Sequence, residues 1–232
     1  MLMDIFSSFD DNNQVFMSLY VLMWIFPLMT ISLFSLSYWA MLPPQWASVI
    51  SIFKDTVSSQ IFRSYGMNMG GFMNIITALF LFLILMNLSG LMPYVFSPTS
   101  HLAVSLSLGL PLWLSLIVSA IFFNPSSVVA GLLPMGAPAP LNPFLVIIET
   151  VSIMVRPITL SVRLTANMSA GHIVLTLIGN YLTASLFMSS VLSMALLLMI
   201  QVLYTVFEFG IALIQAYIFC LLITLYSDEH PH

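Results

Sequence analysis

The chain has 232 residues, of which 60% are hydrophobic and only 5% are charged, and its formal net charge is −4 at pH 7. A soluble domain carries about 25% charged residues, so this composition excludes an ordinary soluble enzyme and favours an integral membrane protein. The single cysteine, Cys220, excludes a disulfide framework and a cysteine-ligated zinc cluster. The sequence contains no basic patch for nucleic acid.

The N-terminal part predicts one span and one surface helix. Residues 15–39 form an apolar run that is longer than the ~20 residues a bilayer requires. In residues 45–63 apolar side chains recur at helical spacing and polar ones occupy the other faces, which predicts an amphipathic helix on the membrane surface. A plain polar loop is the alternative. Lys54 and Arg63 are the only basic residues outside the C-terminal helices, so the positive-inside rule places this segment on the cytoplasm-equivalent side.

Two further spans follow. The first covers residues 71–92 and stops at Pro93, and the second covers residues 100–123 and stops at Asn124-Pro125. A proline-rich link at residues 134–140 is too short to be a domain. It leads to Asn142-Pro143, where asparagine at the N-cap and proline at the first helical position predict a helix start.

The last third of the chain predicts two unusually long helices, residues 143–179 and 181–227. At 1.5 Å per residue they would measure roughly 55 Å and 69 Å, against a hydrocarbon core of ~30 Å. No polar turn divides either one, so we expect a hairpin through Gly179-Asn180, tilted by about 60° instead of the usual ~20°. The predicted fold class is an all-α integral membrane protein with a single membrane domain, residues 1–232.

Four charged side chains interrupt the apolar segment between residues 64 and 227: Glu149, Arg156, Arg163 and Glu208. Each costs about 2.5–3.5 kcal/mol at the bilayer centre on insertion scales, so we expect them to line a polar path or to face a partner. The first three are seven residues apart, and Asn167 follows Arg163 by four. Seven residues are about two helical turns, so these side chains form one stripe.

The second long helix carries a matching stripe. Gln201, Glu208 and Gln215 are also seven residues apart, with Tyr204 beside them. Two such helices packed in antiparallel would enclose a hydrated path, although the two glutamines could equally serve helix packing. His172 lies nine residues after Arg163, about half a turn around the helix, and therefore points to another surface.

The residue types indicate different chemical roles. Glutamate and histidine change protonation at accessible pH, so they can relay protons through a membrane. Arginine keeps its proton under all protein conditions and suits a fixed positive barrier between two paths. Arg163 has no carboxylate one turn away in its own helix. Its counter-charge is therefore expected on another chain.

Two segments carry a family resemblance: R-L-T-A-N-M-S-A-G-H at residues 163–172, and E-F-G-I-A-L-I-Q-A-Y at residues 208–217. Together with Glu149 and Pro157 they resemble subunit a of the mitochondrial F-type ATP synthases, and the likeness covers essentially the whole chain. The resemblance implies a stator subunit in the mitochondrial inner membrane, multi-pass, with the loop of Lys54 and Arg63 on the matrix side. The implied partners are the rotating ring of subunit c, the peripheral-stalk subunit b, small membrane subunits and lipid.

The resemblance also implies roles for individual residues. Two aqueous half-channels that do not meet would flank Arg163, which faces the ring carboxylate. Glu208 and His172 match the half-channel from the intermembrane space, and Glu149 matches the matrix-side exit. In the bacterial branch a carboxylate and a histidine exchange these two places, which suggests that a titratable pair matters more than either identity. The other candidates for the path are Asn167 and Gln215, near the arginine and the ring, and Arg156, Gln201 and Tyr204.

Arg156 has an alternative assignment, because relatives differ at this position: an ion pair with Glu149 or contact with a lipid head group. No phosphate-binding loop of the form G-x-x-x-x-G-K-[ST] occurs, so the chain is not expected to be an enzyme by itself. No cofactor or metal is expected either.

Three other functions remain possible from the sequence. A stand-alone proton-coupled transporter would usually show internal repeats and helices broken at mid-membrane, and neither is evident. A haem-binding redox subunit would need paired histidines within spans, where only His101 and His172 occur; His101, at the start of a span, is more simply an interfacial residue. A purely structural membrane anchor would give Arg163 no functional role.

Overall fold

The computed structural model describes residues 45–92, 95–133, 141–188 and 191–230, together with a few isolated positions before Gln45. The first predicted span, residues 15–39, and the proline-rich link at residues 134–140 lie outside these ranges. Within them the chain is helical and contains no strand. The all-α class predicted from the composition is therefore confirmed for this part of the chain.

The described helices, in chain order, are α2 (Gln45–Ile61), the 3₁₀ turn η2 (Tyr65–Asn68), α3 (Phe72–Gly90), the 3₁₀ turn η3 (Pro98–Ser100), α4 (Leu102–Phe123), α5 (Pro125–Gly131), α6 (Asn142–Met188) and α7 (Val191–Asp228). Four of them, α3, α4, α6 and α7, are long and apolar enough to cross a membrane. The short helix α5 was not expected. Its N-cap Asn124 accepts a hydrogen bond from the Ser127 backbone NH, and Pro125 occupies the first helical position.

The predicted hairpin turn at Gly179-Asn180 is wrong. Helix α6 continues through both residues to Met188, and α7 begins at Val191 instead of residue 181. A glycine in a helix interior costs only about 1 kcal/mol relative to alanine, because it keeps its backbone NH. The many backbone hydrogen bonds of this 47-residue helix can outweigh that cost in free energy. Glycine alone was therefore too weak a signal to end the helix.

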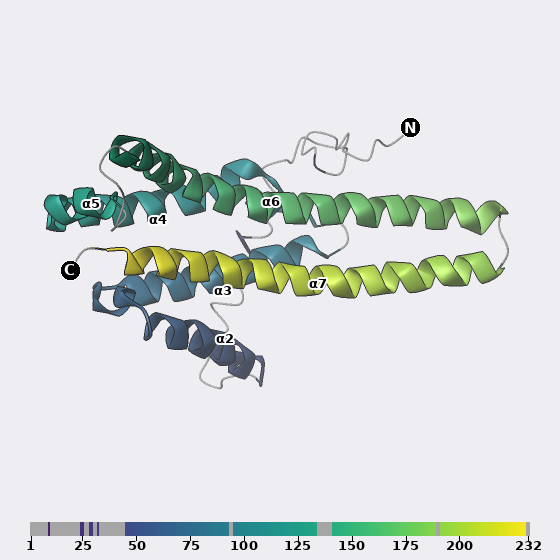
Figure 1. The fold of residues 1–232 in the computed structure, drawn as a ribbon. Helices are drawn as coiled ribbons and strands as arrows, with labels where there is room; N and C mark the ends of the chain where they lie inside the picture. The colour runs from purple at the N-terminus through teal and green to yellow at the C-terminus, as the bar shows by residue number, and fades with distance from the viewer. Residues whose placement is uncertain are drawn as a thin grey trace.

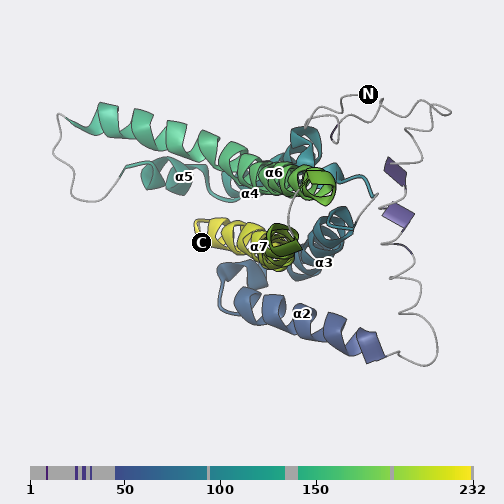
Figure 2. The same cartoon turned by 90° about the vertical axis from the view of Figure 1, so that its right-hand side faces the viewer.

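Helices α6 and α7 form an antiparallel hairpin that organises the molecule (Figure 1). Helix α4 packs on α6, α3 packs on α7, and α2 packs on α3 and also contacts α7. Figure 2 shows that α6 is bent, with its first part leaving the line of the rest. Pro157 lies inside α6. Proline lacks the NH for the helical bond and its ring clashes with the carbonyl four residues earlier, which accounts for the bend.

The core lies where α2, α3, α6 and α7 meet. Its members are buried apolar side chains: Val57, Ile61, Phe72, Ile76, Leu79, Phe80, Leu83, Ile84, Leu160, Leu164, Ala216, Phe219, Cys220 and Ile223. One side of α2 therefore contributes to the core, whereas Lys54 and Arg63 are exposed. This division agrees with the amphipathic pattern of residues 45–63. The tilt of the hairpin relative to a membrane stays a prediction.

The loop after α2 is tied to the end of α7. The backbone NH of Tyr65 donates a hydrogen bond of 2.7 Å to Asp228 Oδ1. A β-carbon at Gly66 would lie 2.7 Å from Phe72 Cδ1 and 2.8 Å from Ser227 Oγ, so only glycine fits this close approach. The loop that follows α2, with Arg63, and the C-terminal end of α7 thus lie at the same end of the molecule.

Candidate functional site

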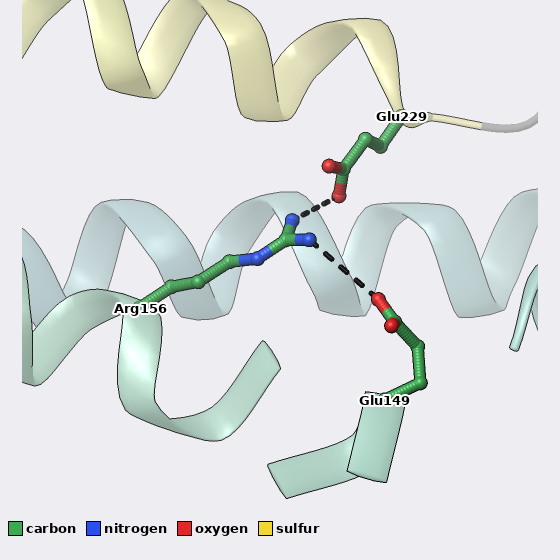
Figure 3. A network of polar contacts seen from close by, with 3 residues as sticks. All are labelled: Glu149, Arg156 and Glu229. Atoms are coloured by element: carbon green, nitrogen blue, oxygen red, sulfur yellow. Dashed lines mark hydrogen bonds and ion pairs between the residues drawn. The ribbon is translucent and has the colours of Figure 1, made fainter. Parts of the chain in front are cut away.

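Arg156 is the centre of a charged cluster that joins α6 to the end of α7 (Figure 3). Its Nη2 lies 3.8 Å from Glu149 Oε1, and its Nη1 donates a hydrogen bond to Glu229 Oε2. The guanidinium carbon lies 5.2 Å from the centre of the Tyr226 ring, a cation–π arrangement. The predicted stripe thus brings Glu149 and Arg156 together, and an ion pair with Glu149 is the observed environment of Arg156.

A cleft of about 460 Å³ opens beside this cluster. Glu149, Arg156 and Glu229 line one part of it, and most of the other lining residues are apolar ones of α4 and α5, such as Trp113 and Val128. The volume holds several water molecules, each of which occupies about 30 Å³ in the liquid. The cleft can therefore hydrate Glu149 from the end of the molecule where α7 finishes.

The ion pairs of Arg156 predict how stability should change when the charges in this cluster are exchanged. Arg156→Glu would place three carboxylates together, and we expect it to lower the thermal stability of the assembled protein by about 1 kcal/mol or more, above the range of an exposed pair because Arg156 is partly buried. Adding Glu229→Arg restores the attraction and should recover much of the loss. The measurement is thermal unfolding of the membrane complex. Equal stability of the single and double variants would contradict the pairing.

Arg163 lies on the exposed surface of α6 and has a different environment from Arg156. None of the ion pairs found within the described ranges involves it. It lines a small hollow between α6 and α7 together with Gln215, Leu160 and Phe219. The structure therefore places Arg163 and Gln215 at one level of the hairpin, with no ion-pair partner for the guanidinium among the described residues.

Glu208 is buried between α7 and α6, with 3% of its surface exposed. It fits because residue 171 is glycine: a β-carbon there would overlap the Glu208 carboxylate. His172, the next residue, is half-buried, and its ring meets that of Phe9 edge-on, with centroids 6.2 Å apart. Glu208 Oε2 and His172 Nε2 are both inaccessible and without a hydrogen-bond partner in the described part of the chain. Buried polar atoms without a partner call for an explanation such as internal water or a functional role.

The remaining candidate residues for the proton path lie on both long helices. Gln201 and Tyr204 are half-buried on α7 near its start, and Gln201 Oε1 lacks a partner among the residues the structure describes. The Tyr204 ring packs against Phe207 at 6.1 Å. Asn167 is half-buried one turn from Arg163. Within the described ranges, no three histidine, cysteine or acidic side chains are grouped so that they could hold a metal ion.

The polar groups fall into two regions separated by the level of Arg163. Along α6, Arg163 lies 14 residues after Glu149 and nine before His172, roughly 21 Å and 14 Å at 1.5 Å per residue. Along α7, Gln215 lies seven residues after Glu208 and 14 before Glu229. One region surrounds Glu149 at the end with the cleft. The other surrounds Glu208 and His172 further along the hairpin.

Sequence reasoning missed Glu229, Gly171 and Asn87. Glu229 continues the seven-residue series of Gln201, Glu208 and Gln215, with Leu222 between, so extending that pattern would have found it. Gly171 had no signal apart from its place beside His172. Asn87, a polar residue in an apolar run, is fully buried, and its Nδ2 donates a hydrogen bond to the backbone carbonyl of Ala212.

A family model and individual known proteins that match this chain carry the same description. The family model described as "ATP synthase A chain" matches residues 15–228. Proteins called "ATP synthase subunit a" from Artemia franciscana and "ATP synthase F(0) complex subunit a" from Scyliorhinus canicula are 46% and 45% identical over 167 and 168 residues, covering 72% and 71% of this chain and 72% and 73% of theirs. "ATP synthase subunit a" from Albinaria caerulea is 40% identical over 204 residues, 84% of this chain and 94% of its own.

Proposed function

Because the chain belongs to the ATP synthase A chain family, we propose that it is the stator subunit in which Arg163 couples proton flow to rotation of a ring of subunit c. Membership itself places the chain in the membrane sector of a proton-translocating ATP synthase, in a mitochondrial context given by the animal relatives. The finer proposal adds two offset half-channels: one reaches Glu208 and His172 from the intermembrane space, and the other leaves by Glu149 to the matrix.

One observation supports this mechanism most directly: an arginine without an ion-pair partner in the described chain separates two polar regions. Arg163 cannot release its proton, so it cannot pass one from the Glu208 region to the Glu149 region. Its charge would attract a carboxylate on a rotating neighbour, which then loads a proton in one region and releases it in the other. Proton flow would in this way require rotation.

The polar residues at the level of Arg163 take supporting roles in this proposal. Gln215 shares the hollow with Arg163, so its amide can hold the guanidinium toward the ring. Asn167, one turn along α6, can do the same from the other side. Gln201 and Tyr204 extend the α7 stripe from Glu208 toward the hairpin turn and would line the outer part of the first half-channel. Arg156 would act at the exit through its pair with Glu149 instead of carrying protons.

The energetics require such coupling. A proton crossing the membrane releases ~2.3 kcal/mol per 100 mV, far too little for one ATP, so several protons must act through one rotor. The chain contains no Gly-rich phosphate loop. ATP would be made elsewhere in the complex, and this subunit would supply the proton path.

The proposed orientation places the loop of Lys54 and Arg63 on the matrix side of the inner membrane. Its support is that the Tyr65–Asp228 hydrogen bond brings this loop to the same end as Glu229 and the cleft beside Glu149. The proposed exit and the basic loop would then share one side. Exposed apolar faces of the hairpin would meet the ring, lipid, subunit b and small membrane subunits.

The test is whether proton flow is coupled. In the intact complex reconstituted in vesicles with an imposed gradient, proton flow should depend on ADP and phosphate, because flow requires rotation. The purified chain reconstituted alone is the control and should conduct no steady proton current. A steady flow through the chain alone, or through the complex without ADP, would favour a stand-alone transporter.

A further inference from the structure

One wall of the cleft beside Arg156 is an apolar stripe along α4. Its residues follow helical spacing and therefore share one face of the helix: Trp113, Leu116, Ile117 and Ala120. Val128 of α5 adds to the same wall. A path for water alone needs polar groups, whereas about half of the residues that line this cleft are apolar. The wall therefore suits a ligand that has an apolar part.

The stripe has about the depth of one membrane leaflet. His230 Nε2 lies 3.2 Å from Ser119 Oγ, so the C-terminal end of α4 lies beside the end of α7. Trp113 lies ten residues before Phe123, the last residue of α4, which is about 15 Å at 1.5 Å per residue. Half of the hydrocarbon core also measures about 15 Å. In a span close to the membrane normal, the stripe would reach from the membrane surface to about its middle.

The charged end of the cleft carries an excess of negative charge. Glu149 and Glu229 approach Arg156 from α6 and from the residue after α7 (Figure 3). Two carboxylates against one guanidinium leave one negative charge in excess, with His230 counted as neutral. Glu149 Oε2 and Glu229 Oε1 have no partner within the described ranges. Charges at membrane depth call for a counter-charge, so this end favours a cationic group.

We propose that the cleft binds one zwitterionic phospholipid with a primary ammonium head group, of the phosphatidylethanolamine type. The ammonium donates hydrogen bonds to the outer oxygens of Glu149 and Glu229, and the lipid phosphate accepts from Arg156. Part of one acyl chain lies along the α4 stripe. The volume of about 460 Å³ falls within the usual 300–1,000 Å³ of ligand sites, and the rest of the lipid stays in the bilayer. This site goes beyond the proposed function and does not depend on the proton path.

The charges distinguish among head groups. A primary ammonium donates three hydrogen bonds, as the lysine side chain does, and can serve both outer carboxylate oxygens. A choline head group is cationic but has no N–H donor. The head group of phosphatidylglycerol carries a net negative charge and would be repelled by the excess negative charge of the cleft.

The test counts the lipids bound to the intact complex. The complex is reconstituted in vesicles of equal parts phosphatidylethanolamine, phosphatidylcholine and phosphatidylglycerol, extracted in mild detergent, and analysed by mass spectrometry for retained lipid. Gly131→Phe fills the cleft from α5, where a β-carbon meets nothing within 4 Å. We expect this variant to retain about one phosphatidylethanolamine fewer per complex than the unaltered protein. Gly179→Phe is the matched control, because a β-carbon there also meets nothing within 4 Å and the residue lies outside the cleft.

A charge reversal tests the head-group assignment. Glu229→Lys changes the excess in the cleft from one negative to one positive charge. We expect the lipid retained at this site to change from phosphatidylethanolamine to phosphatidylglycerol, with a preference of about fivefold in each direction. If Glu229→Lys does not assemble, the head group is decided by the lipid that Gly131→Phe loses: phosphatidylethanolamine supports the assignment, and phosphatidylcholine or phosphatidylglycerol refutes it.

The proposal is overturned if Gly131→Phe and Gly179→Phe retain the same lipids, or if an assembled Glu229→Lys keeps the preference of the unaltered protein. These results are separate from the proposed function. Arg163 lies outside the cleft, so Arg163→Ala should retain the lipid. A normal rate of ATP synthesis in Arg163→Ala would refute the proposed mechanism and leave the lipid site standing.

Discussion

Arg163→Ala is expected to abolish ATP synthesis driven by a proton gradient. The alanine variant lacks the fixed charge that keeps the two polar regions apart and attracts the rotor carboxylate, so we expect a fall of more than about a hundredfold, the size seen when a single preorganised charge or donor is lost. ATP hydrolysis by the soluble part of the complex should persist, because that chemistry takes place elsewhere. Synthesis in reconstituted vesicles and hydrolysis in detergent measure the two activities.

The control for this variant is Arg63→Ala, which removes an exposed arginine just after α2. Its synthesis rate should stay near that of the unaltered complex. Arg163→Lys keeps a positive charge but loses the planar fork of five donors, so it should also be severely impaired. A normal rate in Arg163→Ala would leave the chain as a structural anchor and refute the proposed mechanism.

Gly171→Ala is expected to have the second largest effect. The added methyl group would occupy the place of the Glu208 carboxylate, so either that side chain or the contact between α6 and α7 must move. Overpacking of this kind costs about 1–3 kcal/mol, and a displaced Glu208 would exchange protons from the wrong position. We expect proton-driven synthesis to fall about tenfold or more, measured per assembled complex.

Gly179→Ala is a matched control on the same helix. A β-carbon at Gly179 meets nothing within 4 Å, so alanine should be tolerated there and should favour the helix slightly. If the two alanine variants behave alike, the fit between Gly171 and Glu208 has no functional importance. Reduced assembly of Gly171→Ala with a normal rate per complex would show a purely structural role.

The sequence predicts the helices well because their signal is local. Long apolar runs ended by Pro93 or by Asn124-Pro125 agree with α3 and α4 to within about two residues. The wrong prediction of a turn at Gly179 has the same origin. A glycine in the sequence shows where a helix is locally weak, but it does not show whether the neighbouring backbone hydrogen bonds compensate. The end of α6 at Met188 was therefore not predictable from Gly179-Asn180.

The candidate site was predictable in part for a similar reason. Helical periodicity tells which residues share a face, so the pairing of Glu149 with Arg156 followed from their spacing. Periodicity says nothing about what another helix places opposite that face. The fit of Glu208 against Gly171 and the hydrogen bond from Asn87 to Ala212 join residues far apart in sequence, and only the packed structure brings them together.

The far end of the α6–α7 hairpin extends beyond the other labelled helices (Figure 1). Near its turn, Tyr181, Val191 and Leu192 are 66%, 85% and 81% exposed. These side chains are therefore little constrained by packing within the subunit. Exchanges of one apolar residue for another should therefore be tolerated at this end of the hairpin. They should be tolerated less toward its middle, where a single methyl group added at residue 171 would occupy the place of the Glu208 carboxylate.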